Sequence, residues 1–148
     1  MQIEFGNAGD VDTGGTGWFV GFSPWARNTT AGVDLRYLPQ DRLSHTLCMK
    51  WMTHAAGDPR GVAKPISEGR TLSVLVSTSG LFRLQFSDND RFESNVVEHV
   101  LCRHGDFSVW GAGVFHRYVV DDTSTILTLR WIPLPDDEGG AGSPGDTP

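Results

Sequence analysis

Short stretches that alternate apolar and polar residues recur along almost the whole chain, and this pattern limits the fold more than any other feature. Gly, Asp or Pro separates most of them, as expected when many short strands need turns. About ten strands at near-regular spacing favour a sandwich or closed barrel, because open sheets leave hazardous unpaired edges. The predicted strands are Ile3–Phe5, Gly17–Phe22, Asp34–Tyr37, Leu47–Thr53, Thr71–Ser77, Leu81–Phe86, Asn95–Leu101, Asp106–Trp110, Val114–Val120 and Thr125–Trp131.

Alternation within two of these strands indicates which side chains share a face of the sheet. Phe82 and Leu84 lie on one face of their strand, and Arg83 lies on the other. His116 and Tyr118 share a face of a later strand. Arg83 is either a ligand-binding residue in the barrel lumen, where its charge would need an anionic partner, or a plain surface residue.

The chain has room for one domain and little more. Its 148 residues, of which 39% are hydrophobic, suit a single core, so we expect one β-barrel domain over residues 1–132. Only residues 40–47 suggest a turn of helix, after Pro39. Residues 133–148 are acidic, rich in Gly and Pro, and almost without apolar side chains, which predicts a disordered tail.

Charge and hydropathy exclude several classes of partner. The formal net charge is −6, with no Lys/Arg stripe, which disfavours nucleic-acid binding. No apolar run approaches the roughly 18 residues of a membrane span, and the N-terminus lacks the features of a secretory signal. We therefore expect a cytoplasmic protein, with Cys48 and Cys102 as buried, reduced thiols.

A glycine-rich stretch near the C-terminal end resembles a motif of a known family. Gly105, Gly111, Gly113 and His116 have the spacing of the second motif of the cupin superfamily, G-x5-P-x-G-x2-H-x3-N. Gly111 stands where that family usually has Pro, and Val120 stands where it has Asn.

The first cupin motif, G-x5-H-x-H-x3/4-E-x6-G, is degenerate in this chain. If Gly80 is its closing glycine, Ile66 and Glu68 stand at the paired-His positions, and Ser73 stands at the Glu position. Of the four metal-ligand positions, His116 alone matches the family, with Glu68 as a possible carboxylate substitute. The resemblance therefore implies a degraded or absent metal site.

The resemblance covers about residues 45–131 and implies an all-β, double-stranded β-helix, that is, a jelly-roll or cupin barrel with a pocket in its mouth. Cupins are often dimeric, and we expect a homodimer here. The strands predicted over Ile3–Phe5 and Gly17–Phe22 are apolar, aromatic and available to pair with a second copy.

The long segment between two predicted strands, residues 55–70, borders the expected pocket mouth. It follows His54 and carries Arg60, Lys64, Glu68 and Arg70. Long loops in compact domains are often functional, and three cations near one rim suggest an anionic ligand. The alternative is a solvated loop held by weak surface ion pairs.

These residues lead to three hypotheses. The first is a small-molecule-binding protein without metal, possibly with acid/base chemistry of isomerase or cyclase type on a small anionic metabolite. It uses His116 and Glu68 as catalytic groups, with Tyr118, Lys64, His54 and Arg83 as ligand-binding residues. The second is a metal-dependent dioxygenase or isomerase with Zn, Fe or Mn on His54, Glu68 and His116. The third is a non-catalytic dimeric binding module.

Overall fold

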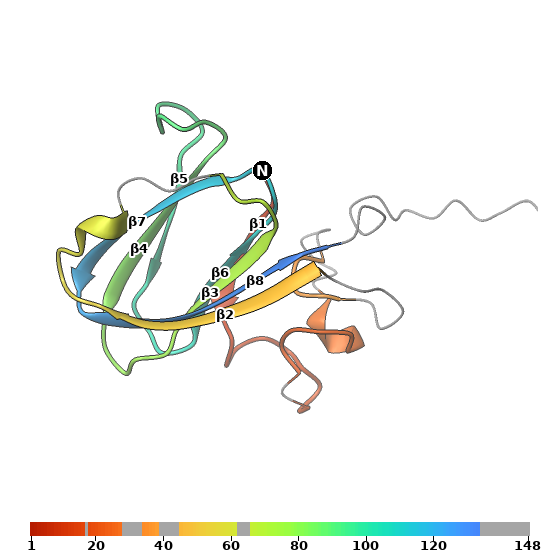
Figure 1. Cartoon of the computed structure of the whole chain (residues 1–148). Helices are drawn as coiled ribbons and strands as arrows, with labels where there is room; N and C mark the ends of the chain where they lie inside the picture. The colour runs from red at the N-terminus through yellow and green to blue at the C-terminus, as the bar shows by residue number, and fades with distance from the viewer. Residues whose placement is uncertain (17, 28–33, 39–44, 62–65, 134–148) are drawn as a thin grey trace, which may run out of the picture.

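Two antiparallel β-sheets face each other in the computed structural model (Figure 1). The structure describes residues 1–16, 18–27, 34–38, 45–61 and 66–133. Two short 3₁₀ turns, η1 (Pro24–Ala26) and η2 (Pro59–Gly61), accompany eight strands. The strands are β1 (Ile3–Asn7), β2 (His45–His54), β3 (Arg70–Leu75), β4 (Leu81–Ser87), β5 (Val97–Leu101), β6 (Asp106–Trp110), β7 (Phe115–Asp122) and β8 (Ser124–Ile132).

The strand order is that of a jelly roll. One sheet has the order β1-β6-β3-β8-β2, and the other has the order β5-β4-β7. The chain crosses between the sheets from β3 to β4, from β5 to β6, from β6 to β7 and from β7 to β8. The last strand, β8, returns to lie between β2 and β3. These crossings confirm the predicted all-β, double-stranded β-helix class.

The main core fills the space between the two sheets. Phe82, Leu84 and Phe86 on β4 are buried, as their period-two spacing predicts. They pack with Val120 from β7 and Ile126 from β8. The inward residues of both sheets thus meet in one layer, as in other sandwiches.

A second, smaller core lies on the outer side of the larger sheet, where the N-terminal segment packs. Leu35 is buried against Leu72, Phe107 and Trp131 of that sheet. Arg36 then forms a buried ion pair with Glu4 of β1, at 3.0 Å, and donates to the carbonyl of Phe19 at 2.8 Å. The described parts of residues 8–38 are therefore held by apolar packing together with a neutralised pair of charges.

The structure corrects several local predictions in this N-terminal half. The described parts of the segments over 17–22 and 34–37 form no strand and share only the isolated bridge between Gly21 and Tyr37. The helical turn predicted over 40–47 is wrong at its C-terminal end, because β2 begins at His45. Residues 40–44 lie outside the described residues, and so do residues 134–148 of the predicted tail. Cys48 and Cys102 are exposed rather than buried.

The glycine turn before His116 joins the two sheets rather than two paired strands. β6 pairs with β1 and β3, whereas β7 pairs with β4, so Gly111–Gly113 carries the chain from one sheet to the other. Ser108 consequently does not pair with His116.

Among the described residues, no helix is long and apolar enough to span a membrane.

Replacing Arg36 by Leu tests the ion pair that anchors the N-terminal segment. The variant leaves the buried Glu4 carboxylate without its cation, so we expect the free energy of unfolding to fall by about 3 kcal/mol. Urea denaturation measures this change. Arg83→Leu breaks an exposed ion pair and should change stability by less than about 1 kcal/mol. Equal effects of the two substitutions would contradict the anchoring role.

Candidate functional site

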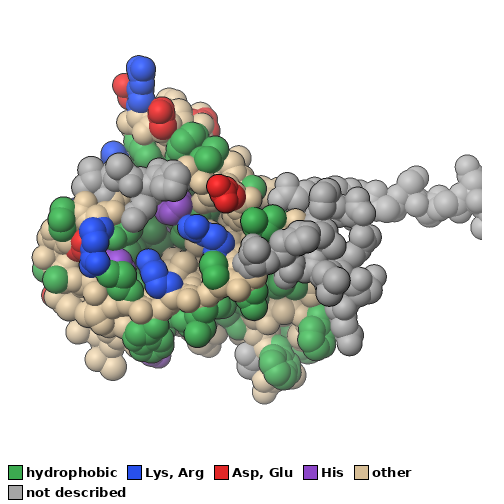
Figure 2. All heavy atoms as spheres, viewed as in Figure 1, with side chains coloured by type: hydrophobic (Ala, Val, Ile, Leu, Met, Phe, Trp, Pro, Cys, Tyr) green, Lys and Arg blue, Asp and Glu red, His purple; other side chains and the backbone are tan. Residues whose placement is uncertain are grey.

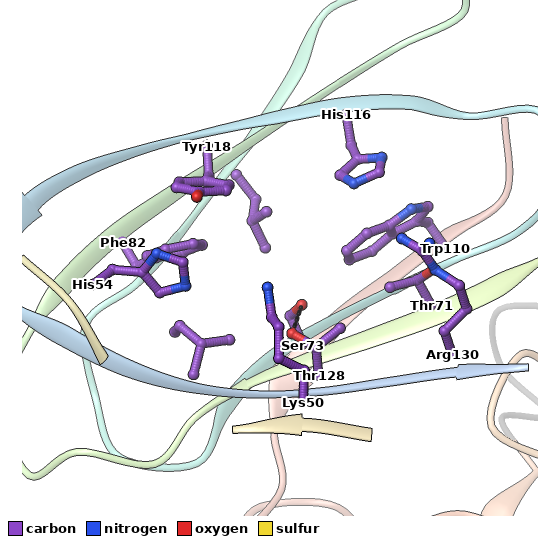
Figure 3. Close-up of a pocket in the computed structure, with 12 residues that line it drawn as sticks. Lys50, His54, Thr71, Ser73, Phe82, Trp110, His116, Tyr118, Thr128 and Arg130 are labelled. Carbon is purple, nitrogen blue, oxygen red and sulfur yellow. Dashed lines mark hydrogen bonds between the residues drawn. The ribbon is translucent and has the colours of Figure 1, made fainter. Parts of the chain in front are cut away.

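A pocket of about 100 Å³ lies between the sheets at the open end of the barrel. Figure 2 shows a hollow in this face, bordered by Lys and Arg side chains, with His side chains inside it. Strands of both sheets supply the walls, as the close-up in Figure 3 shows. The lining residues are Lys50, His54, Thr71, Ser73, Phe82, Leu84, Trp110, His116, Tyr118, Ile126, Thr128 and Arg130.

The register of three adjacent strands builds a polar floor. Thr128 on β8 pairs with both Lys50 on β2 and Ser73 on β3, so these side chains stand in one row. Two residues along β8, Arg130 pairs with Thr71. The hydroxyls of Ser73 and Thr128 are 3.2 Å apart, and Arg130 Nε donates to Thr71 Oγ1 at 3.3 Å. Period-two alternation turns all five side chains toward the same face.

The charge of this floor is positive. Lys50 and Arg130 are the charged residues of the lining, and no Asp or Glu of the described chain lines the pocket. Hydroxyl groups lie beside the cations and can donate further hydrogen bonds. Such a surface is suited to a carboxylate or phosphate group.

His54 ends β2 on the apolar side of the pocket, in contact with Tyr118 and Phe82. Its Nδ1 lies 2.8 Å from Asp58 Oδ2. Burial lowers the pKa of His54 below its ordinary value of 6.5, and the hydrogen bond to Asp58 opposes this change. The imidazole is therefore neutral near pH 7.

Asp58 is fixed by the short loop that follows β2. Arg60 donates from Nε and Nη2 to the two oxygens of Asp58, at 2.8 and 2.7 Å, and holds the pKa of that carboxyl well below its usual range. The loop packs closely on β7, where a Cβ on Gly61 would lie 2.0 Å from the Tyr118 carbonyl oxygen. Glycine permits this approach, which sets Asp58 beside His54.

His116 lies on β7 against the ring of Trp110, with the ring centroids 4.9 Å apart. Its Nδ1 lies 3.2 Å from Ser67 Oγ, and that hydroxyl accepts a hydrogen bond of 2.8 Å from Trp110 Nε1. Backbone hydrogen bonds of Ser67 with Gly113 and Val114 hold it in place. His116 is therefore oriented by a buried polar chain.

Tyr118 lies on β7, two residues after His116, and its ring contacts His54 of β2. Its ring stacks on Phe82 at 4.9 Å and meets His54 edge-on at 5.0 Å. Burial raises the pKa of Tyr118 above its ordinary value of 10, and the charge of Asp58 adds to this effect. The phenol is therefore protonated at neutral pH.

The structure brings some of the predicted site residues together and separates others. His54, His116 and Tyr118 all line the pocket. Glu68 is exposed and outside the lining, so the structure gives it no position for catalysis. Arg83 faces outward from β4 and donates to Asp121 at 2.6 Å, because it alternates with the buried Phe82 and Leu84. Lys64 lies outside the described residues.

Sequence reasoning missed the cations of the floor and the partners of the histidines. Lys50 lies four residues before His54 on one strand, so the period of two places both on one face. That signal was present in the sequence. Asp58 and Ser67, by contrast, lie in loops, and no local pattern indicates their contacts.

The metal site of the second hypothesis is not formed by the described residues. Among them no three His, Cys, Asp or Glu side chains converge on one point. His54 and His116 enter the pocket from separate places, beside Phe82 and beside Trp110 respectively (Figure 3). With Glu68 outside the lining, the ligand set His54, Glu68 and His116 for Zn, Fe or Mn is not assembled.

No protein-family model and no curated protein sequence matches this chain. Among solved structures it is similar to Streptomyces albus HEPD with 2-hydroxyethylphosphonate and Fe(II) bound, with 14% identity, a TM-score of 0.48, and coverage of 67% of this chain and 22% of that one. The hydroxypropylphosphonic acid epoxidase from S. wedmorenis has 13% identity and a TM-score of 0.44, and the match covers 57% of this chain and 42% of that one. The TDP-quinovose 3,4-ketoisomerase WlaRB from Campylobacter jejuni has 15% identity and a TM-score of 0.46, and the match covers 61% of this chain and 72% of that one.

All three likenesses are at 15% sequence identity or less and have TM-scores below 0.5. This chain spans less than half the length of the first two proteins. Its assignment to the jelly-roll class rests on its own strand pairing, described above.

The depressed pKa of His54 predicts a pH dependence of stability. Between the ordinary value of 6.5 and the lower value in the folded state, the unfolded chain binds more protons at this residue. We therefore expect the free energy of unfolding to fall as the pH drops below 6.5, and His54→Gln to make that fall shallower. Urea denaturation from pH 7.5 to 5 measures how the free energy of unfolding changes with pH in the wild-type chain and in His54→Gln. A pH dependence of stability in His54→Gln as steep as that of the wild-type chain would contradict the assignment.

Proposed function

We propose that this chain binds a small anionic molecule in the pocket and acts on it by metal-free acid/base chemistry of isomerase or cyclase type. The observation that carries the proposal is the composition of the lining. Two cations and three hydroxyl side chains line the wall formed by the larger sheet, His54 ends β2 of the same sheet, and His116 lies on β7 of the facing sheet, with no carboxylate among the described lining residues. The anion binds to the floor, and the histidines exchange protons with the rest of the molecule.

The floor suits an anion for electrostatic and geometric reasons. Lys50 provides a compact charge that can turn toward the ligand, whereas Arg130 provides a planar group with several donors. Arg130 donates from Nε to Thr71, and the terminal nitrogens of its guanidinium carry further donors that suit a ligand oxygen. A pocket of about 100 Å³ accepts a small acid, or one end of a longer molecule.

Neutralising the floor tests the proposal. We expect Lys50→Met and Arg130→Met each to weaken binding of inorganic phosphate or malonate about tenfold or more, because a charge-assisted hydrogen bond contributes about 1.5–3 kcal/mol. Isothermal titration calorimetry at low salt measures the affinities. Arg83→Met is the control, because it removes a cation outside the pocket and changes the net charge by the same amount. Unchanged affinity in both floor variants would overturn the proposal.

A second candidate function, a homodimeric module, is favoured by the exposed outer face of β2. This is the edge strand of the larger sheet as described, and it is ten residues long. Leu47, Met49 and Trp51 on its outer face are 67%, 69% and 65% exposed. Long apolar edges are an aggregation hazard unless they are paired or charged, and this face carries no charge over residues 47–53.

A second copy of this chain is the partner that fits β2. Antiparallel pairing of two β2 strands about a two-fold axis joins both sheets and brings the apolar stripes together. The three side chains offer roughly 300–400 Å² per protomer, about half of a standard interface, and the ten-residue backbone edge supplies the hydrogen bonds. The interface first predicted, at Ile3–Phe5 and Gly17–Phe22, would instead place its first strand, β1, at the opposite edge of the larger sheet, whereas the described part of the second segment forms no strand.

Light scattering over a range of protein concentrations tests this dimer. We expect dimer at high concentration and a shift toward monomer in Trp51→Glu, which places a charge on the apolar stripe. Val119→Glu, an equivalent change on an exposed position of β7, should leave the mass unchanged. A wild-type chain that stays monomeric at the highest concentration would exclude this dimer.

A further inference from the structure

We infer that the two pocket histidines are held in opposite tautomers, so that His54 is the proton acceptor of the site and His116 is its hydrogen-bond donor. The catalytic part of this inference rests on the proposed function. It goes further by assigning a direction to proton transfer and a chemical class to the substrate. Both assignments follow from the hydrogen-bond partner that each ring has at Nδ1.

The tautomer of His54 is fixed by Asp58. An ionised carboxylate only accepts hydrogen bonds, so the contact of 2.8 Å requires the proton on Nδ1 of His54. The bidentate contact with Arg60 keeps Asp58 ionised. In the neutral ring Nε2 then carries a lone pair. His54 lines the pocket, and Nε2 is the ring nitrogen left for it, so His54 can accept a proton from a bound molecule.

The tautomer of His116 is fixed by Ser67 and Trp110. The indole Nε1 of Trp110 is a donor only, so the Ser67 hydroxyl accepts that bond. Ser67 is buried, and the position for its own hydrogen that satisfies the group is the bond toward Nδ1 of His116. Nδ1 therefore accepts, and the ring proton lies on Nε2. In this form His116 presents an N–H group rather than a lone pair, which also suits an oxygen atom better than a metal ion.

The two rings stand apart in the pocket (Figure 3), and Lys50 lies on β2, the strand of His54, in the sheet that faces His116. An acceptor, a donor and a cation around one cavity are the groups needed to remove a proton from carbon next to a carbonyl group. The substrate class is therefore a small carbonyl compound with a carboxylate or phosphate group and an acidic C–H bond.

The reaction step balances without a co-reactant. The proton on carbon passes to Nε2 of His54, the C–H electron pair becomes a C=C bond, and the carbonyl π pair moves onto oxygen. The enolate oxygen accepts a hydrogen bond from Nε2–H of His116, and Lys50 offsets its charge. His54 then returns a proton to carbon, which gives epimerisation, isomerisation or exchange with solvent.

Long-range ¹⁵N–¹H correlation NMR on the uniformly ¹⁵N-labelled chain at pH 7.5 tests the tautomers without any substrate. We expect a protonated Nδ1 and an unprotonated Nε2 for His54, and the reverse for His116. His54→Gln and His116→Gln assign the signals, and Ser67→Ala should shift His116 toward the other tautomer while leaving His54 unchanged. The same tautomer in both rings, or no response of His116 to Ser67→Ala, would overturn the inference.

Hydrogen exchange in D₂O tests the chemical step, with pyruvate as a small carboxylate that has C–H bonds next to a carbonyl group. We expect exchange above the buffer rate, with a loss of at least about 100-fold in His54→Gln. In His116→Phe the exchange should slow while the anion still binds. Bound pyruvate that shows no exchange would overturn the catalytic roles but not the anion-binding proposal. Failure of phosphate, malonate and pyruvate to bind would instead overturn the anion-binding proposal, and with it the catalytic step.

Discussion

The register of β8 against its two neighbours is the constraint on which the site depends. Because strand side chains alternate, one position on β8 decides which residues of β2 and β3 stand beside it on the inner face. Thr128 lies in a row with Lys50 and Ser73, and the next inward position, Arg130, lies beside Thr71. A slip of β8 by one residue would turn Arg130 to the outer face and bring an apolar neighbour such as Leu129 to the inner face.

The two sheets enclose both the apolar core and the pocket. Toward one end, Phe86, Leu101 and Leu75 fill the space between the sheets. At the pocket, the inward positions of the larger sheet carry polar side chains that do not pack densely. A buried polar group needs partners, and here Ser67 and Asp58 provide them for the histidines of the site. The loops therefore orient the reactive groups, whereas the strands supply the charge.

The strands could be predicted from the sequence far better than the site. Phe82 and Leu84 alternate with Arg83, and such spacing specifies a strand and its buried face. β2 shows the limit of this reasoning, because its apolar residue Trp51 is exposed. The N-terminal segment covers only part of the outer face of the sheet, and no local pattern reveals which part. The contacts of Asp58 and Ser67 likewise depend on the tertiary fold, because both residues lie in loops.

The central claim is that the cationic floor binds an anion. Backbone amide chemical-shift mapping during titration with malonate tests it most directly, because it locates the binding site without relying on any substitution. The account predicts saturable shifts concentrated on the floor residues of β2, β3 and β8 and on His116, with β5 unaffected. Shifts confined to the N-terminal segment, or spread evenly without saturation, would contradict it.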